Sequence, residues 1–308
     1  MTQEPIPHWP GELVRIGDHQ VYVRSAPDRG GEPALCVHGL AGSSRNWTDL
    51  IDLLRPRLAC DALDLPGFGD SPPRPDRRYS IAALAQTVAA FIESRKNKVH
   101  LIASSLGGTV AVKVAATRPD LVRTLTLISP ALPDPRPHLD QVHFAVLSLP
   151  GVGPRLLRKY DALPPQNRVA DVITTCFADP ARFGEERFAA EVAELARRDT
   201  LDHATAALIG TIRTLTADFF RQGRHTGWRD AARITAPTLV IYGSDDRVVD
   251  PRMAGRAAHA FANARIVVLP RTGHLAHMEH PEQVAAEIAI MLDATAQRAR
   301  EFPLAPAG

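Results

Sequence analysis

The sequence predicts an α/β fold with a mostly parallel, twisted sheet and helices on both faces. Short apolar runs alternate with helical periodicities over residues 34–128 and again over 238–292. A proline-interrupted, helical stretch without a clear buried strand separates these two parts. We therefore expect one core made of residues 1–130 and 233–308, with an inserted helical lid at 131–232.

Composition excludes several classes of protein. The 308 residues carry a formal net charge of +2, which does not indicate binding to nucleic acid or to an anionic membrane. No apolar run is long enough to span a bilayer, and residues 1–10 lack the pattern of a signal peptide. Cys36, Cys60 and Cys176 form no CxxC pair. We expect a cytoplasmic protein with a small-molecule substrate and no integral membrane segment, and leave the oligomeric state unassigned.

The first part of the chain divides into strands and helices. Alternating apolar residues at 13–16 and 20–24 flank Gly17-Asp18-His19, which predicts an antiparallel hairpin. Ser44 is expected to cap one helix and Ser80 to cap another at 81–95, because serine oxygens accept from free N–H groups at helix starts. The remaining expected elements are strands at 34–37, 58–65, 99–103 and 121–128 and a helix at 105–116.

The second part begins with the expected lid. Prolines at 130–137 predict a stiff entrance, and amphipathic patterns predict helices at 185–198 and 205–221. Asp250 before Pro251 is typical of a helix N-cap. The last expected elements are strands at 238–242 and 265–269, a helix at 253–261 and a final helix from Pro281.

The stretch 99–109 predicts a serine at a sharp strand-to-helix turn. A nucleophile on such a turn needs small residues two positions before and after it, because strand and helix pass close together. Ser105 has Ala103 and Gly107 at those positions, whereas Ser104 would have the bulky Ile102 and Leu106. The spacing favours Ser105 as a nucleophile; the alternative is an ordinary connection with a serine cap.

Further polar groups follow other predicted strands. A serine nucleophile needs a base, and the base needs a carboxylate that orients it. His274 follows the strand at 265–269, and Asp245 and Asp246 follow the strand at 238–242. Since ligands of such sheets bind at the carboxyl ends of the strands, these groups are expected to meet there.

These segments together resemble the α/β-hydrolase fold superfamily over nearly the whole chain. The matching stretches are His38-Gly39-Leu40-Ala41-Gly42, Asp64-Leu65-Pro66-Gly67-Phe68-Gly69-Asp70-Ser71, Ser105-Leu106-Gly107-Gly108, Gly243-Ser244-Asp245-Asp246-Arg247-Val248-Val249 and Gly273-His274 through Glu279-His280-Pro281. Ala103 departs from the glycine that is usual before the nucleophile.

The resemblance implies a catalytic triad of Ser105, His274 and Asp246. It places the acid three residues after Gly243, which favours Asp246 over Asp245. It also implies an oxyanion hole formed by the backbone N–H groups of Leu40 and Leu106. His38, Asp64 and Glu279 are expected to have structural roles, and His277 and His280 are expected to be structural or solvated.

The resemblance also narrows the reaction. Ser105 argues against the relatives that use an aspartate nucleophile, namely haloalkane dehalogenases and epoxide hydrolases. Carbon–carbon hydrolases usually carry Trp after the histidine and Asn before the serine, where this chain has Leu275 and Ser104. We expect cleavage of an ester, lactone or thioester. A carbon–carbon hydrolase, a metal-free perhydrolase and a non-catalytic ligand receptor stay open as alternatives.

Apolar residues of the lid are expected to shape the substrate site. Phe144 and Leu147, with Leu275 after the histidine, are the candidate substrate-binding residues, and they favour an apolar acyl group. No phosphate loop, dinucleotide fingerprint or metal-ligand cluster is found in the sequence, so we expect no cofactor and no metal.

Overall fold

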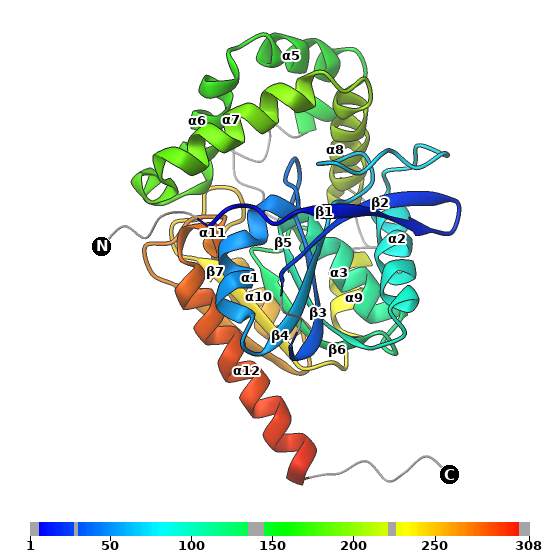
Figure 1. Cartoon of the computed structure of the whole chain (residues 1–308), viewed down its shortest axis with the longest axis vertical. Coiled ribbons are helices and arrows are strands. Elements are labelled where there is room, and N and C mark those ends of the chain that lie inside the picture. The colour runs from blue at the N-terminus through cyan, green and yellow to red at the C-terminus, as the bar shows by residue number, and fades with distance from the viewer. Residues whose placement is uncertain (1–5, 28–29, 135–144, 221–225, 302–308) are drawn as a thin grey trace.

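An eight-stranded sheet forms the centre of the molecule (Figure 1). The computed structural model describes residues 6–27, 30–134, 145–220 and 226–301. The strand order is β1-β2-β4-β3-β5-β6-β7-β8, and only the β1–β2 and β2–β4 pairs are antiparallel. The strands are β1 (Gly11–Ile16), β2 (His19–Ser25), β3 (Glu32–Val37), β4 (Leu58–Leu63), β5 (Val99–Ser104), β6 (Val122–Ile128), β7 (Thr238–Gly243) and β8 (Ala264–Leu269). The predicted fold class and N-terminal hairpin are confirmed.

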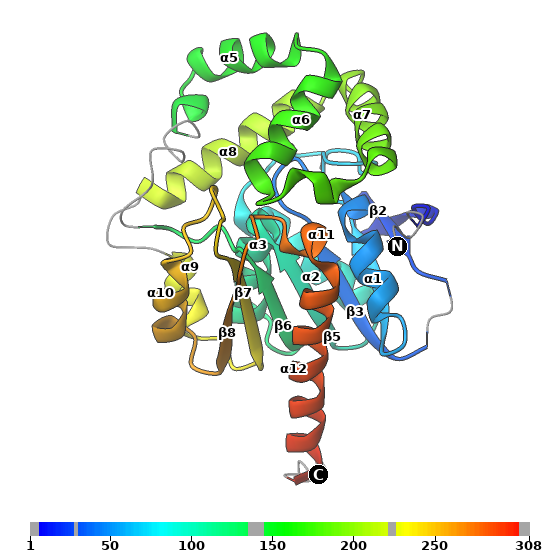
Figure 2. The same cartoon turned by 90° about the vertical axis from the view of Figure 1, so that its left-hand side faces the viewer.

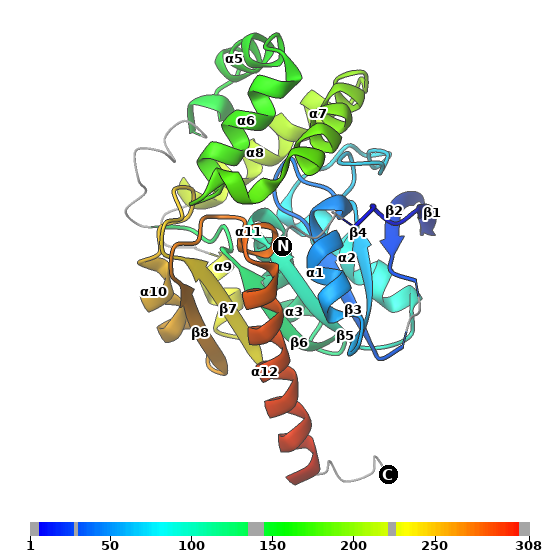
Figure 3. The same ribbon diagram turned by 60° about the vertical axis from the view of Figure 1, so that its left-hand side comes forward.

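Helices cover both faces of the sheet. On one face lie α2 (Ile81–Ser94), α3 (Ser105–Thr117), α9 (Thr226–Ala231) and α10 (Met253–Ala260), which share one apolar cluster. A second cluster joins the other face to α1 (Thr48–Leu54), α11 (Ala276–Glu279) and α12 (Pro281–Glu301), and Figure 3 shows α12 in front of the sheet.

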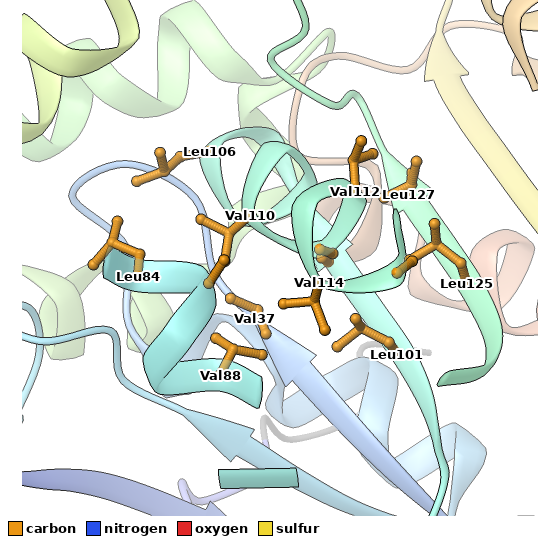
Figure 4. Packing of buried hydrophobic residues seen from close by; sticks show 14 of the residues in the cluster. Val37, Leu84, Val88, Leu101, Leu106, Val110, Val112, Val114, Leu125 and Leu127 are labelled. Carbon is orange, nitrogen blue, oxygen red and sulfur yellow. The ribbon is translucent and has the colours of Figure 1, made fainter. Parts of the chain in front are cut away.

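The larger cluster explains why α3 stays fixed on the sheet. Figure 4 shows Val110 and Val114 of α3 close to Val37 of β3 and Leu101 of β5, with Val88 of α2 beside them. All five side chains are almost fully buried. Burying an aliphatic side chain of this size contributes about 1.5–3 kcal/mol to folding, so the start of α3 rests on a rigid base.

A helical block follows β6 and precedes β7. We use this name for residues 152–220, which form α5 (Val152–Asp161), α6 (Pro165–Cys176), the 3₁₀ helix η2 (Pro180–Phe183), α7 (Glu185–Asp199) and α8 (Ala204–Phe220). These described residues contain no strand. Figures 1 and 2 show the block above the edge of the sheet from which α3 and α11 start. Its own cluster centres on Val169, Ile173, Phe177 and Phe183.

The helix α9 packs with the sheet helices rather than with this block. Trp228 and Ala231 belong to the large cluster under α3. Lys113 Nζ of α3 lies 3.1 Å from Asp230 Oδ2, and Trp228 Nε1 donates to the Pro133 carbonyl at 2.7 Å. Residues 226–232, which the sequence placed in the lid, therefore make core contacts.

Several element boundaries differ from the sequence-based expectation. Ser43, not Ser44, caps the 3₁₀ helix η1 (Ser44–Trp47) that leads into α1; Asn46 accepts from the Ser43 N–H at 2.8 Å. The Ser44 N–H instead donates to Asp64 Oδ1 at 2.5 Å.

Two further boundaries concern Asp250 and Ser80. Asp250 does not cap α10. Its carboxylate accepts from the N–H of Arg252, the residue directly before the helix, at 2.8 Å. Ser80 caps α2 as predicted, accepting from the Ala83 N–H at 3.2 Å.

No helix within the described residues combines the length and apolar character needed to cross a membrane.

Candidate active site

Ser105 occupies a strained turn between β5 and α3. Its φ is +50°, in the left-handed region that non-glycine residues rarely adopt, and such strain is often found at functional sites. A side chain at residue 107 would not fit, because a Cβ there would lie 2.3 Å from the Val37 carbonyl oxygen. A Cβ on Gly39 would lie 3.1 Å from the Ser105 Cβ. The close approach assumed from the sequence is present.

The neighbouring Ser104 has a different environment. Its side chain is buried, and its Oγ has no hydrogen-bond partner among the described residues. Both serines border a large cavity, but Ser105 is only half-buried. The geometry therefore separates the two hydroxyls and leaves Ser105 the more accessible one.

Asp246 and His274 meet at the carboxyl ends of β7 and β8. His274 Nδ1 lies 2.9 Å from Asp246 Oδ2 and 3.2 Å from Oδ1. Since an ionised carboxylate only accepts, Nδ1 carries the proton and donates, which leaves Nε2 able to accept one. Asp245 is exposed instead, and its Oδ2 accepts from the Ser244 hydroxyl at 2.6 Å.

The environment of Asp246 keeps it ionised. Burial raises its pKa, but the positive charge of His274 when protonated, together with the hydrogen bonds from His274 and from the Val249 N–H, outweighs burial, so the pKa lies below its usual value. The Val248 and Val249 N–H groups both donate to Oδ1 at 2.8 Å. A buried acceptor held in this way fixes the orientation of the His274 ring.

Ser105 and His274 line the same cavity of about 1720 Å³, between the sheet and the helical block. In the described part of the chain no hydrogen bond joins their side chains. Such bonds are often long before a substrate binds. Leu147 and Leu275 also line this cavity, whereas Phe144 lies outside the described residues. Among the described residues, no three metal-ligating side chains gather into a cluster.

Leu40 and Leu106 lie in two segments next to Ser105, the loop after β3 and the start of α3. Leu106 is the second residue of α3, whose first N–H groups have no partner within the helix. Leu40 lines the cavity in the loop after β3. Both N–H groups thus belong to segments that border Ser105, and their role as an oxyanion hole stays a prediction.

His38 holds the Leu40 loop in place. Its Nδ1 donates to the Gly39 carbonyl at 2.7 Å, and its Nε2 accepts from the Leu65 N–H at 2.9 Å. This pattern requires a neutral ring. Complete burial, the main cause, lowers the pKa of His38 to about 4.

Asp64 stabilises the end of the loop that contains Leu40. Its carboxylate accepts from the Ser44 and Asp70 N–H groups, and a Cβ on Gly69 would lie 2.3 Å from Asp64 Oδ2. Burial raises the pKa of Asp64 to about 6 despite these hydrogen bonds.

The helical block contacts the His274 loop through backbone groups. The Cys176 carbonyl, at the end of α6, accepts from the His274 N–H at 2.7 Å and the Leu275 N–H at 3.3 Å. The buried Glu279 carboxylate accepts from the Gly273 N–H at 2.7 Å and from the Asp179 N–H at 2.8 Å. No sequence pattern marks the Cys176 contact, because any residue type supplies a carbonyl.

His277 is buried against Trp47 and also lines the cavity. The two rings stack with centroids 4.3 Å apart. Burial, with a smaller effect of His274, lowers the pKa of His277 to about 3, so the ring is neutral. The sequence pattern did not distinguish this position from a solvated histidine.

The charged side chains that line the cavity, among them two from α7, were not identified from the sequence. Glu191 and Arg198 of α7 line it, although the helix was expected only to be amphipathic. Because they are seven residues apart, the sequence could have shown that they share one face of the helix. It could not have shown that this face borders the cavity with Ser105.

Comparison with known proteins gives a consistent result. Residues 33–281 match the family model described as alpha/beta hydrolase fold. The chain is 29% identical to the dihydrolipoyllysine-residue acetyltransferase component of the acetoin cleaving system of Pseudomonas putida, over 85% of this chain and 64% of the relative's length. It therefore spans less than two thirds of that relative.

Other similar proteins are closer to this chain in length. The monoacylglycerol lipase abhd6-A of Xenopus laevis is 26% identical over 82% of this chain and 72% of its own. The structure of potato (Solanum tuberosum) epoxide hydrolase I superposes with a TM-score of 0.76 at 17% identity, covering 92% of this chain and 99% of that one. At that identity the structural likeness concerns the fold alone.

Proposed function

The chain belongs to the alpha/beta hydrolase fold family, and we propose that within it the chain is a serine hydrolase of carboxylic esters, lactones or thioesters. The observation that carries the proposal is the Asp246–His274 hydrogen bond, which borders the same cavity as the strained Ser105. The similarity to a lipase supports hydrolysis of an ester bond.

The proposed reaction follows from the positions of these groups. Ser105 Oγ attacks the carbonyl carbon while His274 Nε2 takes the hydroxyl proton, and Asp246 stabilises the resulting imidazolium. The N–H groups of Leu40 and Leu106 would bind the developing oxyanion, aided by the N-terminus of α3. His274 then gives its proton to the leaving alcohol or thiol, and water hydrolyses the acyl-enzyme by the reverse proton path.

We further propose that the helical block acts as the lid and shapes the acyl side of the cavity. Its residues Leu157, Val169, Ile173 and Leu208 all line the cavity. Because α9 packs with the core, we now place the end of the proposed lid before residue 226 rather than at 232. Excluding water from the site would strengthen the hydrogen bonds to the oxyanion.

A fluorophosphonate probe tests the proposed nucleophile. Wild-type protein and the Ser104→Ala control should be labelled covalently, and Ser105→Ala should not. Ser105→Ala should also lower kcat by about 10³-fold or more on any ester that the protein cleaves. Labelling of Ser105→Ala but not of Ser104→Ala would reject this assignment. A folded wild-type protein that is not labelled would favour a ligand-binding protein.

A further inference from the structure

The cavity above Ser105 has two chemically different sides. The side formed by α5, α6 and α8 carries many of the leucine, isoleucine and valine side chains of the lining, although Arg168 and Asp171 of α6 also border it. The opposite side is formed by loop 39–46 and α7, and it is polar: Ser43, Asn46, Glu191 and Arg198 line the cavity there. A substrate that fills both sides needs an apolar part and a polar part.

Arg198 lies beside the loop that contains Leu40. Its Nη1 donates to the Ala41 carbonyl at 2.6 Å, and Ala41 follows Leu40 directly. Glu191 lies seven residues earlier in α7, which is about two helical turns, and therefore on the same face. The polar side of the cavity thus begins next to the proposed oxyanion hole.

Several other charged groups near the cavity already have partners. The buried Arg168 pairs with Asp199 and Asp161, which joins α6 to the ends of α7 and α5. Glu194 lies 2.7 Å from Arg197 and 3.4 Å from Arg45. These groups are used to hold the helical block together and to the core.

Glu191 differs from them. Within the described residues its carboxyl group makes no hydrogen bond or ion pair, although it lines the cavity and is half-buried. Burial raises its pKa, opposed by the charge of Arg198. A half-buried carboxylate without a protein partner can bind water, and it is therefore free to accept a hydrogen bond from a ligand in the cavity.

The chemistry of this pair selects the ligand. Glu191 repels an anionic group, and Arg198 repels a cationic one. A hydroxyl group both donates and accepts, so a neutral polyol satisfies the two side chains together. We propose that Glu191 and Arg198 form a subsite for a neutral polyol, with Glu191 accepting from one hydroxyl and Arg198 donating to a neighbouring one. The substrate class is then a monoacyl ester of a polyol such as glycerol; assigning the ester bond to Ser105 rests on the proposed function.

Binding to the Ser105→Ala protein tests the subsite without requiring turnover. Glycerol monooctanoate and ethyl octanoate share an acyl chain and differ in the alcohol. Titration calorimetry should show the glycerol ester binding about tenfold or more tightly, as expected for one hydrogen bond to a charged group. Adding Glu191→Leu should remove this preference and leave ethyl octanoate binding within about twofold.

Two further variants serve as controls. Glu191→Gln keeps an amide oxygen and should retain most of the preference. Glu186→Leu changes an exposed glutamate on the same helix and should have no effect on either ester. Equal affinity of Ser105→Ala for the two esters, or equal losses for both in Glu191→Leu, would overturn the subsite.

Turnover by wild-type protein separates the two proposals. Hydrolysis of both esters with no preference in binding would reject the subsite and keep the proposed function. Selective binding without hydrolysis or probe labelling would reject the proposed function and keep the subsite.

Discussion

The interactions inside the sheet core differ from those that attach the helical block to it. The core around Val37, Leu101 and Val110 is fully buried and apolar. The contact of α7 with the core relies on charged side chains, since Arg187 pairs with Asp49 and Arg197 with Asp70. Apolar burial gives rigidity, whereas exposed ion pairs contribute little and are screened by salt.

This difference separates two tasks. The groups proposed for catalysis start from buried strands, so their relative positions are fixed by the core. Glu191 and Arg198, the pair proposed for selectivity, lie on α7, whose contact with the core includes the ion pairs above. We expect substitutions in the core to change rate and stability, and substitutions in the block to change the choice of substrate with smaller effects on stability.

The largest expected effect is on catalysis at the strand ends. Asp246→Asn should leave the fold intact and lower kcat by about 10⁴-fold, because an amide can stabilise the wrong tautomer of His274. Asp245→Asn is the matched control and should cost far less, since the Asp245 side chain is exposed and accepts from the neighbouring Ser244 hydroxyl. Steady-state kinetics on a cleaved ester measures both, and equal losses would contradict the assignment.

The next effect compares stability in the two regions. Leu101→Ala should lower the free energy of unfolding by about 2–5 kcal/mol, because a buried leucine is replaced by a void. Ile173→Ala in α6 should cost less than half of that, because Ile173 already borders the cavity. Urea denaturation gives both values. A larger loss in Ile173→Ala than in Leu101→Ala would show that the helical block contributes to stability as much as the sheet core does.

A smaller effect depends on pH. The folded-state pKa of His277, about 3, lies below its unfolded value, so its contribution to stability is complete above about pH 6.5 and is lost as the pH falls. Between pH 7.5 and 5 the wild type should lose about 2 kcal/mol through this group. His277→Phe keeps the ring stacked on Trp47 and should lose about 2 kcal/mol less over that interval.

The control for this measurement is His259→Gln, at an exposed position. It should follow the wild-type pH dependence. A His277→Phe protein with an unchanged pH dependence would mean that His277 takes up its proton in the folded state as readily as in the unfolded one.

The smallest effect concerns the polar contact of the block with the core. Arg197→Gln removes the ion pair with Asp70, whose Oδ1 lies 3.0 Å from Arg197 Nη2. Unfolding free energy should fall by less than about 1 kcal/mol, and the difference should shrink in 1 M salt. A salt-independent loss above that size would mean that this interface behaves like a buried core.

How far the sequence predicted each region follows from the same difference. The flanks Ala103 and Gly107 selected Ser105 because backbone closeness restricts side-chain size. Asp246 and His274 follow strands of a parallel sheet, whose ends share one edge. The cap Ser43 was misassigned to Ser44 because two adjacent serines offer the same side chain, and only the backbone decides which one lies outside the helix.

The helical block was predicted less completely for a physical reason. Helical periodicity located α7 and α8 within one residue, but periodicity does not tell where a helix lies relative to the sheet. The roles of Glu191 and Arg198 depend on that placement. The contact from Cys176 uses a carbonyl oxygen, which every residue has, so no sequence pattern could mark it.

That carbonyl has a consequence for exchanging parts between related proteins. Because Cys176 and Asp179 bond to the segment of residues 273–279, a chimaera in which the whole block is replaced would leave the His274 and Gly273 backbone groups facing a foreign partner. A junction placed after Phe183 would keep residues 176–183 with their native loop and exchange only α7 and α8. Exchange of α7 and α8, which line part of the cavity, should therefore be tolerated. Replacement of residues 176–183, which contact the His274 segment, should not be.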